Sequence, residues 1–100
     1  MAKGVVFIGD EIAAAGFRLA GAAVRVPERG AETRVLREET ARAALVLLAR
    51  AAAERVDPRE LAQALALPSP LVIVLPDSAG LSAAIDVAAR VRLQLGIGQT

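Results

Sequence analysis

The sequence contains no cysteine and no histidine among its 100 residues. This composition excludes disulfides, thiolate nucleophiles, imidazole bases and the common zinc sites. Aromatic side chains are nearly absent as well, since Phe7 and Phe17 are the only two. The core must therefore be built from Val, Leu, Ile and Ala. Because alanine buries little area, a partner that covers additional surface would help to stabilise the fold.

Charge of one sign is not in excess, since the net charge is +1. No run of basic residues is present and aromatic stacking groups are lacking, which argues against nucleic-acid binding. No window of about 18 apolar residues lacks charges, so no membrane insertion is expected. The short apolar run after Lys3 soon reaches Asp10 and does not resemble a signal peptide. We therefore expect a cytoplasmic protein.

The sequence lacks the motifs of nucleotide-binding sites and of common catalytic sites. A dinucleotide fingerprint needs G-x-G-x-x-G after a strand, whereas Gly9 is followed next by Gly16, and no Gly-Lys-Ser/Thr phosphate loop occurs. The serine hydroxyls have no histidine to activate them, and no carboxylate pair stands out. The sequence thus predicts no catalytic residue, no cofactor-binding residue and no metal ligand, and a protein that is not an enzyme and needs no cofactor.

What the sequence does contain is an alternation of apolar runs and helical stretches. The runs predict strands near residues 5–8, 22–26, 44–48 and 71–75. The third strand has an alternative, because residues 41–56 could also form one long alanine-rich helix. We favour the strand, since Leu45-Val46-Leu47-Leu48 has no helical period.

Helices are expected near residues 11–20, 32–42, 51–67 and 78–95. Asp10 is placed to cap the first helix and Gly21 to end it. A break is expected at Asp57-Pro58, where Asp57 would cap a second piece. The alternation predicts one α/β domain over residues 1–100, with a four-stranded parallel sheet flanked by helices in a Rossmann-like or receiver-like layout and a C-terminal helix.

Two helices carry apolar residues away from their predicted inner stripes. The inner stripe of the first helix is expected at Ile12, Ala15, Gly16 and Leu19, which leaves Phe17 outside it. The inner stripe of the last helix is expected at Leu81, Ala84, Ile85, Ala88, Val91 and Leu95. We expect a partner surface on these two helices, with Phe17, Arg18, Val87, Arg90 and Leu93 as its candidate residues.

Gly9-Asp10-Glu11 follows the first strand, and doubly wound sheets bind ligands at such carboxyl ends. A receiver-type site would also need an Asp after the third strand and a lysine after a late one. The third strand instead ends at Ala49-Arg50, and Lys3 is the only lysine. Asp10 is more simply a helix cap, but a free-standing regulatory or ligand-binding domain that uses the Asp10 end of the sheet stays open as an alternative.

The segment from Gly9 to Gly21 resembles the opening of the F subunit of the V/A-type rotary ATPases. In that family an apolar strand is followed by a Gly-Asp or similar pair and by a short helix ending Gly-Phe-x-Leu-Ala-Gly. The matching residues are Gly9, Asp10, Gly16, Phe17, Leu19, Ala20 and Gly21. Weaker similarity lies at the end of the chain, in Leu71 to Pro76, Gly80-Leu81 and the closing Leu95-Gly96-Ile97.

This resemblance implies a non-catalytic central-stalk subunit of a proton- or sodium-translocating ATPase or ATP synthase. Such a protein binds the coiled-coil shaft, which is the D subunit of the complex, and turns with it. The family's roles are to stabilise the shaft, to adjust the coupling of ATP turnover to rotation and to help attach the shaft to the membrane-side rotor. Regulation is usually credited to the last helix. The implied location is cytoplasmic and peripheral to the membrane.

Overall fold

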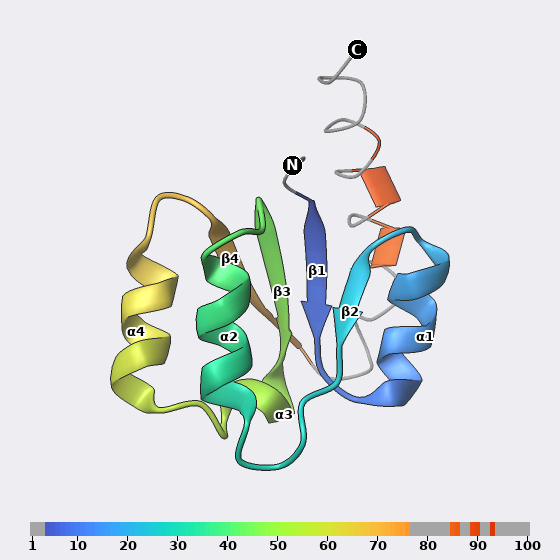
Figure 1. Ribbon diagram of the computed structural model, residues 1–100. Helices are drawn as coiled ribbons and strands as arrows, with labels where there is room; N and C mark the ends of the chain where they lie inside the picture. Colours follow the sequence, from blue (N-terminus) through green and yellow to red (C-terminus); the bar gives the residue numbers. More distant parts are fainter. Residues whose placement is uncertain (1–3, 77–84, 87–88, 91–92, 94–100) are drawn as a thin grey trace.

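The computed structural model in Figure 1 describes residues 4–76, 85–86, 89–90 and 93. Its elements are β1 (Val5–Ile8), α1 (Glu11–Leu19), β2 (Ala23–Arg25), α2 (Glu32–Thr40), β3 (Leu45–Ala49), α3 (Arg50–Ala53), α4 (Pro58–Ala66) and β4 (Leu71–Leu75). Residues 85–86, 89–90 and 93 are helical as well. The rest of the last helix predicted at 78–95 lies outside the described residues.

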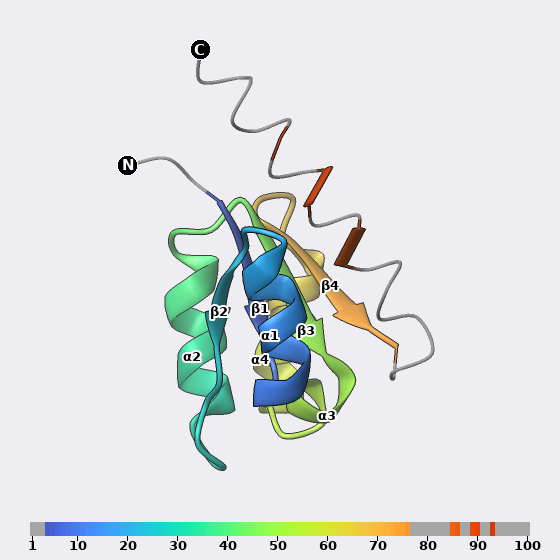
Figure 2. The same ribbon diagram turned by 90° about the vertical axis from the view of Figure 1, so that its right-hand side faces the viewer.

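The strands form one sheet in the order β2-β1-β3-β4, in which every neighbouring pair is parallel. In the register of this sheet, Phe7 lies between Val24 and Leu47. Helices cover both faces, as the view along the sheet in Figure 2 shows. The predicted fold class is therefore confirmed as a small α/β protein whose four-stranded parallel sheet is flanked by helices.

Side chains alternate between two apolar layers because successive residues of a strand point to opposite faces. Val6 and Ile8 of β1 pack with residues of α2, α3 and α4 on one face of the sheet. Val5 and Phe7 pack on the other face with Ala14 and Phe17 of α1. The two aromatic rings stack there, with centroids 4.3 Å apart and planes 10° from parallel. The second layer is thus centred on the Phe7–Phe17 pair.

The third apolar run is a strand, as predicted, and the alternative of one helix over residues 41–56 is wrong. Leu45 to Leu48 are all buried, because β3 lies in the interior of the sheet between β1 and β4 and both of its faces are covered. The predicted break at Asp57-Pro58 is also confirmed. The Asp57 side chain accepts hydrogen bonds from the N–H groups of Arg59 and Glu60, and Pro58 occupies the first turn of α4.

Both ends of α1 are set as the sequence predicts. An Asp10 carboxylate oxygen accepts from the Ala13 N–H over 2.8 Å. At the other end Gly21 has φ of 94°, a left-handed conformation that favours glycine. Its N–H donates to the Arg18 carbonyl over 3.1 Å, and the Ala22 N–H donates to the Phe17 carbonyl over 3.0 Å. These two bonds satisfy carbonyl groups that the end of a helix leaves free.

The rotation of α1 about its own axis differs from the prediction. Ala14 and Phe17 are its buried residues, whereas Ile12 and Leu19, expected on the inner stripe, are exposed. Phe17 and Leu19 point about 160° apart on a helix, so they cannot both face the sheet. Because an aromatic ring buries more area than either aliphatic side chain, the stack of Phe17 on Phe7 determines which face turns inward. The predicted inner stripe is therefore the outer one.

Candidate interaction surface

The outer face of α1 carries a line of apolar side chains that we call the outer stripe: Ile12, Ala15 and Leu19. Ile12 is 88% exposed and Leu19 91%, the largest exposed fractions among the large apolar residues that the structure describes. Ala15 between them is exposed too. Since Ile12 and Leu19 are separated by about two helical turns, they point in nearly the same direction, away from the sheet.

Two different borders enclose the outer stripe. On one side Arg18 donates a hydrogen bond to Glu11 over 3.4 Å, and both side chains are exposed. On the other side Gly16 faces Ile85 of the last helical segment, because a Cβ built on Gly16 would lie 2.6 Å from Cδ1 of Ile85. The outer stripe therefore lies between an exposed ion pair and a neighbouring helical residue.

The candidate interface residues fall into three groups. Arg18, Arg90 and Leu93 are exposed, with Leu93 57% exposed and Arg90 paired with Asp86 over 3.1 Å. Val87 lies outside the described residues. Phe17 was expected on the surface, and this expectation is wrong, because the ring is fully buried against Phe7. Ile12 and Leu19 occupy the exposed face of α1 instead.

Most motif residues of the first helix have a structural explanation within the chain. Asp10 caps α1, Gly21 ends it, and Ala20 is its C-terminal cap residue, with its N–H donating to the Gly16 carbonyl over 3.1 Å. Gly9 has no space for a side chain, because a Cβ there would lie 2.4 Å from the Phe7 ring. Leu19 differs from these residues, since it is the exposed member of the motif with the large apolar side chain.

The carboxyl ends of β1 and β3 border a cavity of about 180 Å³. Each of its three acidic residues has a partner within the chain: Asp10 caps α1, the exposed Glu11 lies 3.4 Å from Arg18, and buried Glu32 accepts from the Gly30 N–H over 2.8 Å and lies 3.7 Å from Arg55. Within the described ranges, His, Cys, Asp and Glu form no group of three or more that could hold a metal ion. These contacts assign the carboxylates to holding the loops in place.

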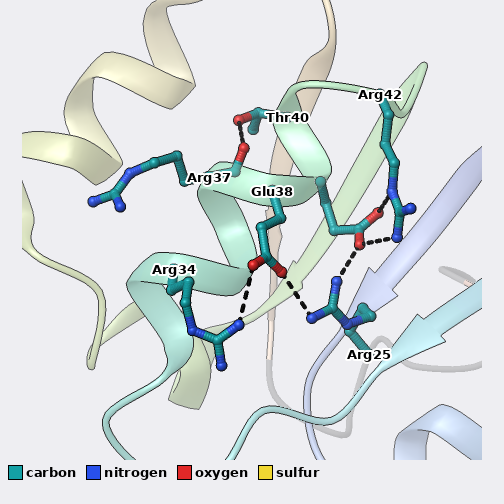
Figure 3. Close-up of polar contacts among 7 residues, drawn as sticks. Arg25, Arg34, Arg37, Glu38, Thr40 and Arg42 are labelled. Carbon is teal, nitrogen blue, oxygen red and sulfur yellow. Dashed lines mark hydrogen bonds and ion pairs between the residues drawn. The ribbon is translucent and has the colours of Figure 1, made fainter.

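A charged network joins the edge strand β2 to α2, as Figure 3 shows. Arg25 of β2 donates to Glu39 and, over 3.0 Å, to Glu38. Arg42 donates to both carboxylate oxygens of buried Glu39, and Arg34 donates to Glu38. The sequence does not indicate this network, because its residues form no recognisable motif.

The network lowers the pKa of both carboxylates. Burial on its own raises the pKa of Glu39, but hydrogen bonds from Arg42 and Arg25 outweigh it, and the pKa lies below its usual value. Hydrogen bonds from Arg25 and Arg34 also lower the pKa of Glu38. A lowered folded-state pKa contributes stability above the ordinary pKa of glutamate. That stability is lost as the pH falls through the folded-state value.

The variant Glu39→Gln is expected to lose about 1–2 kcal/mol of unfolding free energy at neutral pH, because two guanidinium groups lose their charged acceptor. At an acidic pH below the lowered folded-state pKa of Glu39, the carboxyl of the unmodified protein is neutral as well, so the difference between the two proteins should shrink. Urea unfolding at both pH values measures this effect. The exposed Glu28→Gln change is the control and should stay within about 0.5 kcal/mol. An equal loss at both pH values would contradict a role for the charge.

The fold and its surface define a small α/β protein that exposes an apolar helix face. The model of one protein family, the ATP synthase (F/14-kDa) subunit, matches residues 5–91, which include every strand of the sheet and α1. The chain belongs to this family, and the resemblance to the F subunit of the V/A-type ATPases is confirmed. Members of this family are accessory subunits of the rotary ATPase complex.

Two further comparisons, with curated proteins and with solved structures, found no match. In the part of the chain that the structure describes, none of the helices has the length and apolar character needed to cross a membrane.

Proposed function

We propose that this chain is a non-catalytic central-stalk subunit of a V/A-type proton- or sodium-translocating ATPase or ATP synthase. It binds the coiled-coil shaft, the D subunit of that complex, turns with the shaft and modulates the coupling of ATP turnover to rotation. The proposed location is the cytoplasmic side, peripheral to the membrane as part of the complex. Regulation would involve the last helix, in keeping with the resemblance to the F-subunit family.

One observation carries the proposal: a member of the F-subunit family leaves the apolar outer face of α1 exposed. A helix that carries apolar residues on two opposite faces is normally covered on both of them. In this chain the sheet covers Ala14 and Phe17, and the outer stripe lies open. A binding protein within an assembly accounts for this distribution. The alternative ligand-binding domain gains no such support, since Asp10 is engaged as a helix cap.

The proposal is tested by mixing the purified full chain with the purified coiled-coil subunit of the same complex. We expect one complex with one copy of each, seen by size-exclusion chromatography with light scattering. An unrelated coiled coil of similar length is the control and should elute separately. If the folded chain and the shaft protein elute separately at tens of micromolar, the proposed function is wrong.

A further inference from the structure

The outer stripe has the geometry of a helix-packing seam. Ile12 and Leu19 lie two turns apart on the same line, and the exposed Ala15 between them is small. Large residues at both ends with a small one in the middle allow the backbone of a second helix to approach closely while its side chains pack between Ile12 and Leu19. A flat sheet or an irregular loop would not match this spacing.

The charged residues beside the outer stripe determine which charges a partner helix must carry. Glu11 lies beside the N-terminal end of the stripe and Arg18 beside its C-terminal end, and they pair over 3.4 Å with both side chains exposed. Each therefore has room for another ion of opposite charge. A complementary helix would carry a basic residue beside Glu11 and an acidic residue about two turns away beside Arg18. This order of charges would fix the direction in which the helix lies.

The size of the outer stripe argues against a second copy of this chain as its occupant. A nine-residue helix is about 13 Å long. Two such helices packed together cover far less than the about 800 Å² per partner that a stable complex buries. A longer helix can continue beyond α1 onto neighbouring surface of the same chain. On the Gly16 side that surface is the last helical segment, where Leu93 is exposed.

We propose that the outer stripe is the main contact with the shaft: one long α-helix of the coiled-coil subunit lies along Ile12, Ala15 and Leu19, with its charges paired to Glu11 and Arg18. This inference rests on the proposed function, because it names the surface through which the shaft is bound. It assigns the contact to the face of α1 opposite Phe17. The far side of the sheet, where α4 lies, is left out of the contact.

The first test measures the affinity of full-length variants for the purified coiled-coil subunit by calorimetry. The double change Ile12→Asp with Leu19→Asp should weaken binding about 100-fold or more, because two apolar side chains lose their buried contacts and two carboxylates enter the seam. The matched control is Leu65→Asp on α4, an exposed leucine on the other side of the sheet, with unchanged affinity expected. Circular dichroism verifies that each variant is folded.

The second test does not depend on the fold tolerating two aspartates. Because the chain has no cysteine, Leu19→Cys provides a unique thiol for a photo-crosslinking label, with Leu65→Cys as the control. We expect the Leu19 position to crosslink to a helix of the coiled-coil subunit and the Leu65 position to give no such product.

The outcomes separate this inference from the proposed function. If the unmodified chain binds the shaft, while the folded double variant binds equally well or the Leu19 label does not reach the shaft, the outer stripe is not the contact and the function still stands. A crosslink from Leu19 to a second copy of this chain also overturns the inference. If the unmodified chain does not bind the shaft, both are wrong.

Discussion

Replacing Phe17 with alanine should cost about 3–5 kcal/mol of unfolding free energy. The ring is fully buried and stacks on Phe7, with centroids 4.3 Å apart. Its neighbours on α1 include Ala13 and Ala14, which are too small to fill the space that the ring would leave. For a domain whose whole stability is about 5–15 kcal/mol, a loss of this size brings the protein close to unfolding.

Urea unfolding of Phe17→Ala and Leu19→Ala, on the same helix, measures this difference. Leu19 is 91% exposed, and its truncation should change the unfolding free energy by no more than about 0.5 kcal/mol. The ratio of the two losses of unfolding free energy shows which face of α1 is buried. If Leu19→Ala destabilised the chain as much as Phe17→Ala, the helix would instead have the orientation that its sequence pattern suggests.

Replacing Gly9 with alanine should cost about 2–3 kcal/mol, because the added methyl group overpacks the core. An ideal Cβ there would lie 2.4 Å from Cζ of Phe7 and 2.8 Å from Cβ of Ala49. The Phe7 ring cannot move aside easily, since it is stacked on Phe17. The restriction at Gly9 is one of space, unlike that at Gly21, whose φ is 94°.

Gly16→Ala is the matched control for Gly9→Ala. The closest atom to a Cβ at Gly16 is Cδ1 of Ile85, the tip of a flexible side chain, at 2.6 Å. A rotamer change can relieve that contact, and alanine gains about 1 kcal/mol over glycine inside a helix. We therefore expect Gly16→Ala to stay within about 1 kcal/mol of the unmodified protein. Thermal and urea unfolding of both variants compare the two sites.

A double variant tests whether the ring is the obstacle at Gly9. Phe7→Leu removes the atoms that crowd the new methyl group, so that Gly9→Ala should cost less in that background than alone. Equal costs in both backgrounds would show that the Phe7 ring is not what excludes a side chain at Gly9.

Much of the fold follows from local signals in the sequence. The apolar run at Leu45 to Leu48 predicts an interior strand because it lacks a helical period, and β3 is that strand. Asp10, Gly21 and Asp57 act through contacts within a few residues of themselves, which is why their capping roles can be predicted. The order of strands and helices then favours a parallel sheet.

The candidate surface could not be predicted in the same way. Residues 12 to 16 of α1 are all apolar or glycine, so the helical pattern does not distinguish its two faces. The deciding contact is the stack of Phe17 on Phe7, between residues of different elements. The Glu39–Arg25 contact likewise joins α2 to β2 and carries no local pattern. Contacts between elements thus determine both the outer stripe and the buried charge.

The central claim, that this chain is part of the rotor, is tested most directly by watching it turn. Gln63→Cys on the exposed surface of α4 provides a unique thiol for a bead, because the chain has no cysteine. The labelled chain is assembled into a rotary complex whose catalytic part is fixed to a surface. On addition of ATP the bead should rotate continuously in one direction. A bead that stays fixed while the same complexes hydrolyse ATP and turn a label on the shaft would contradict the proposed function.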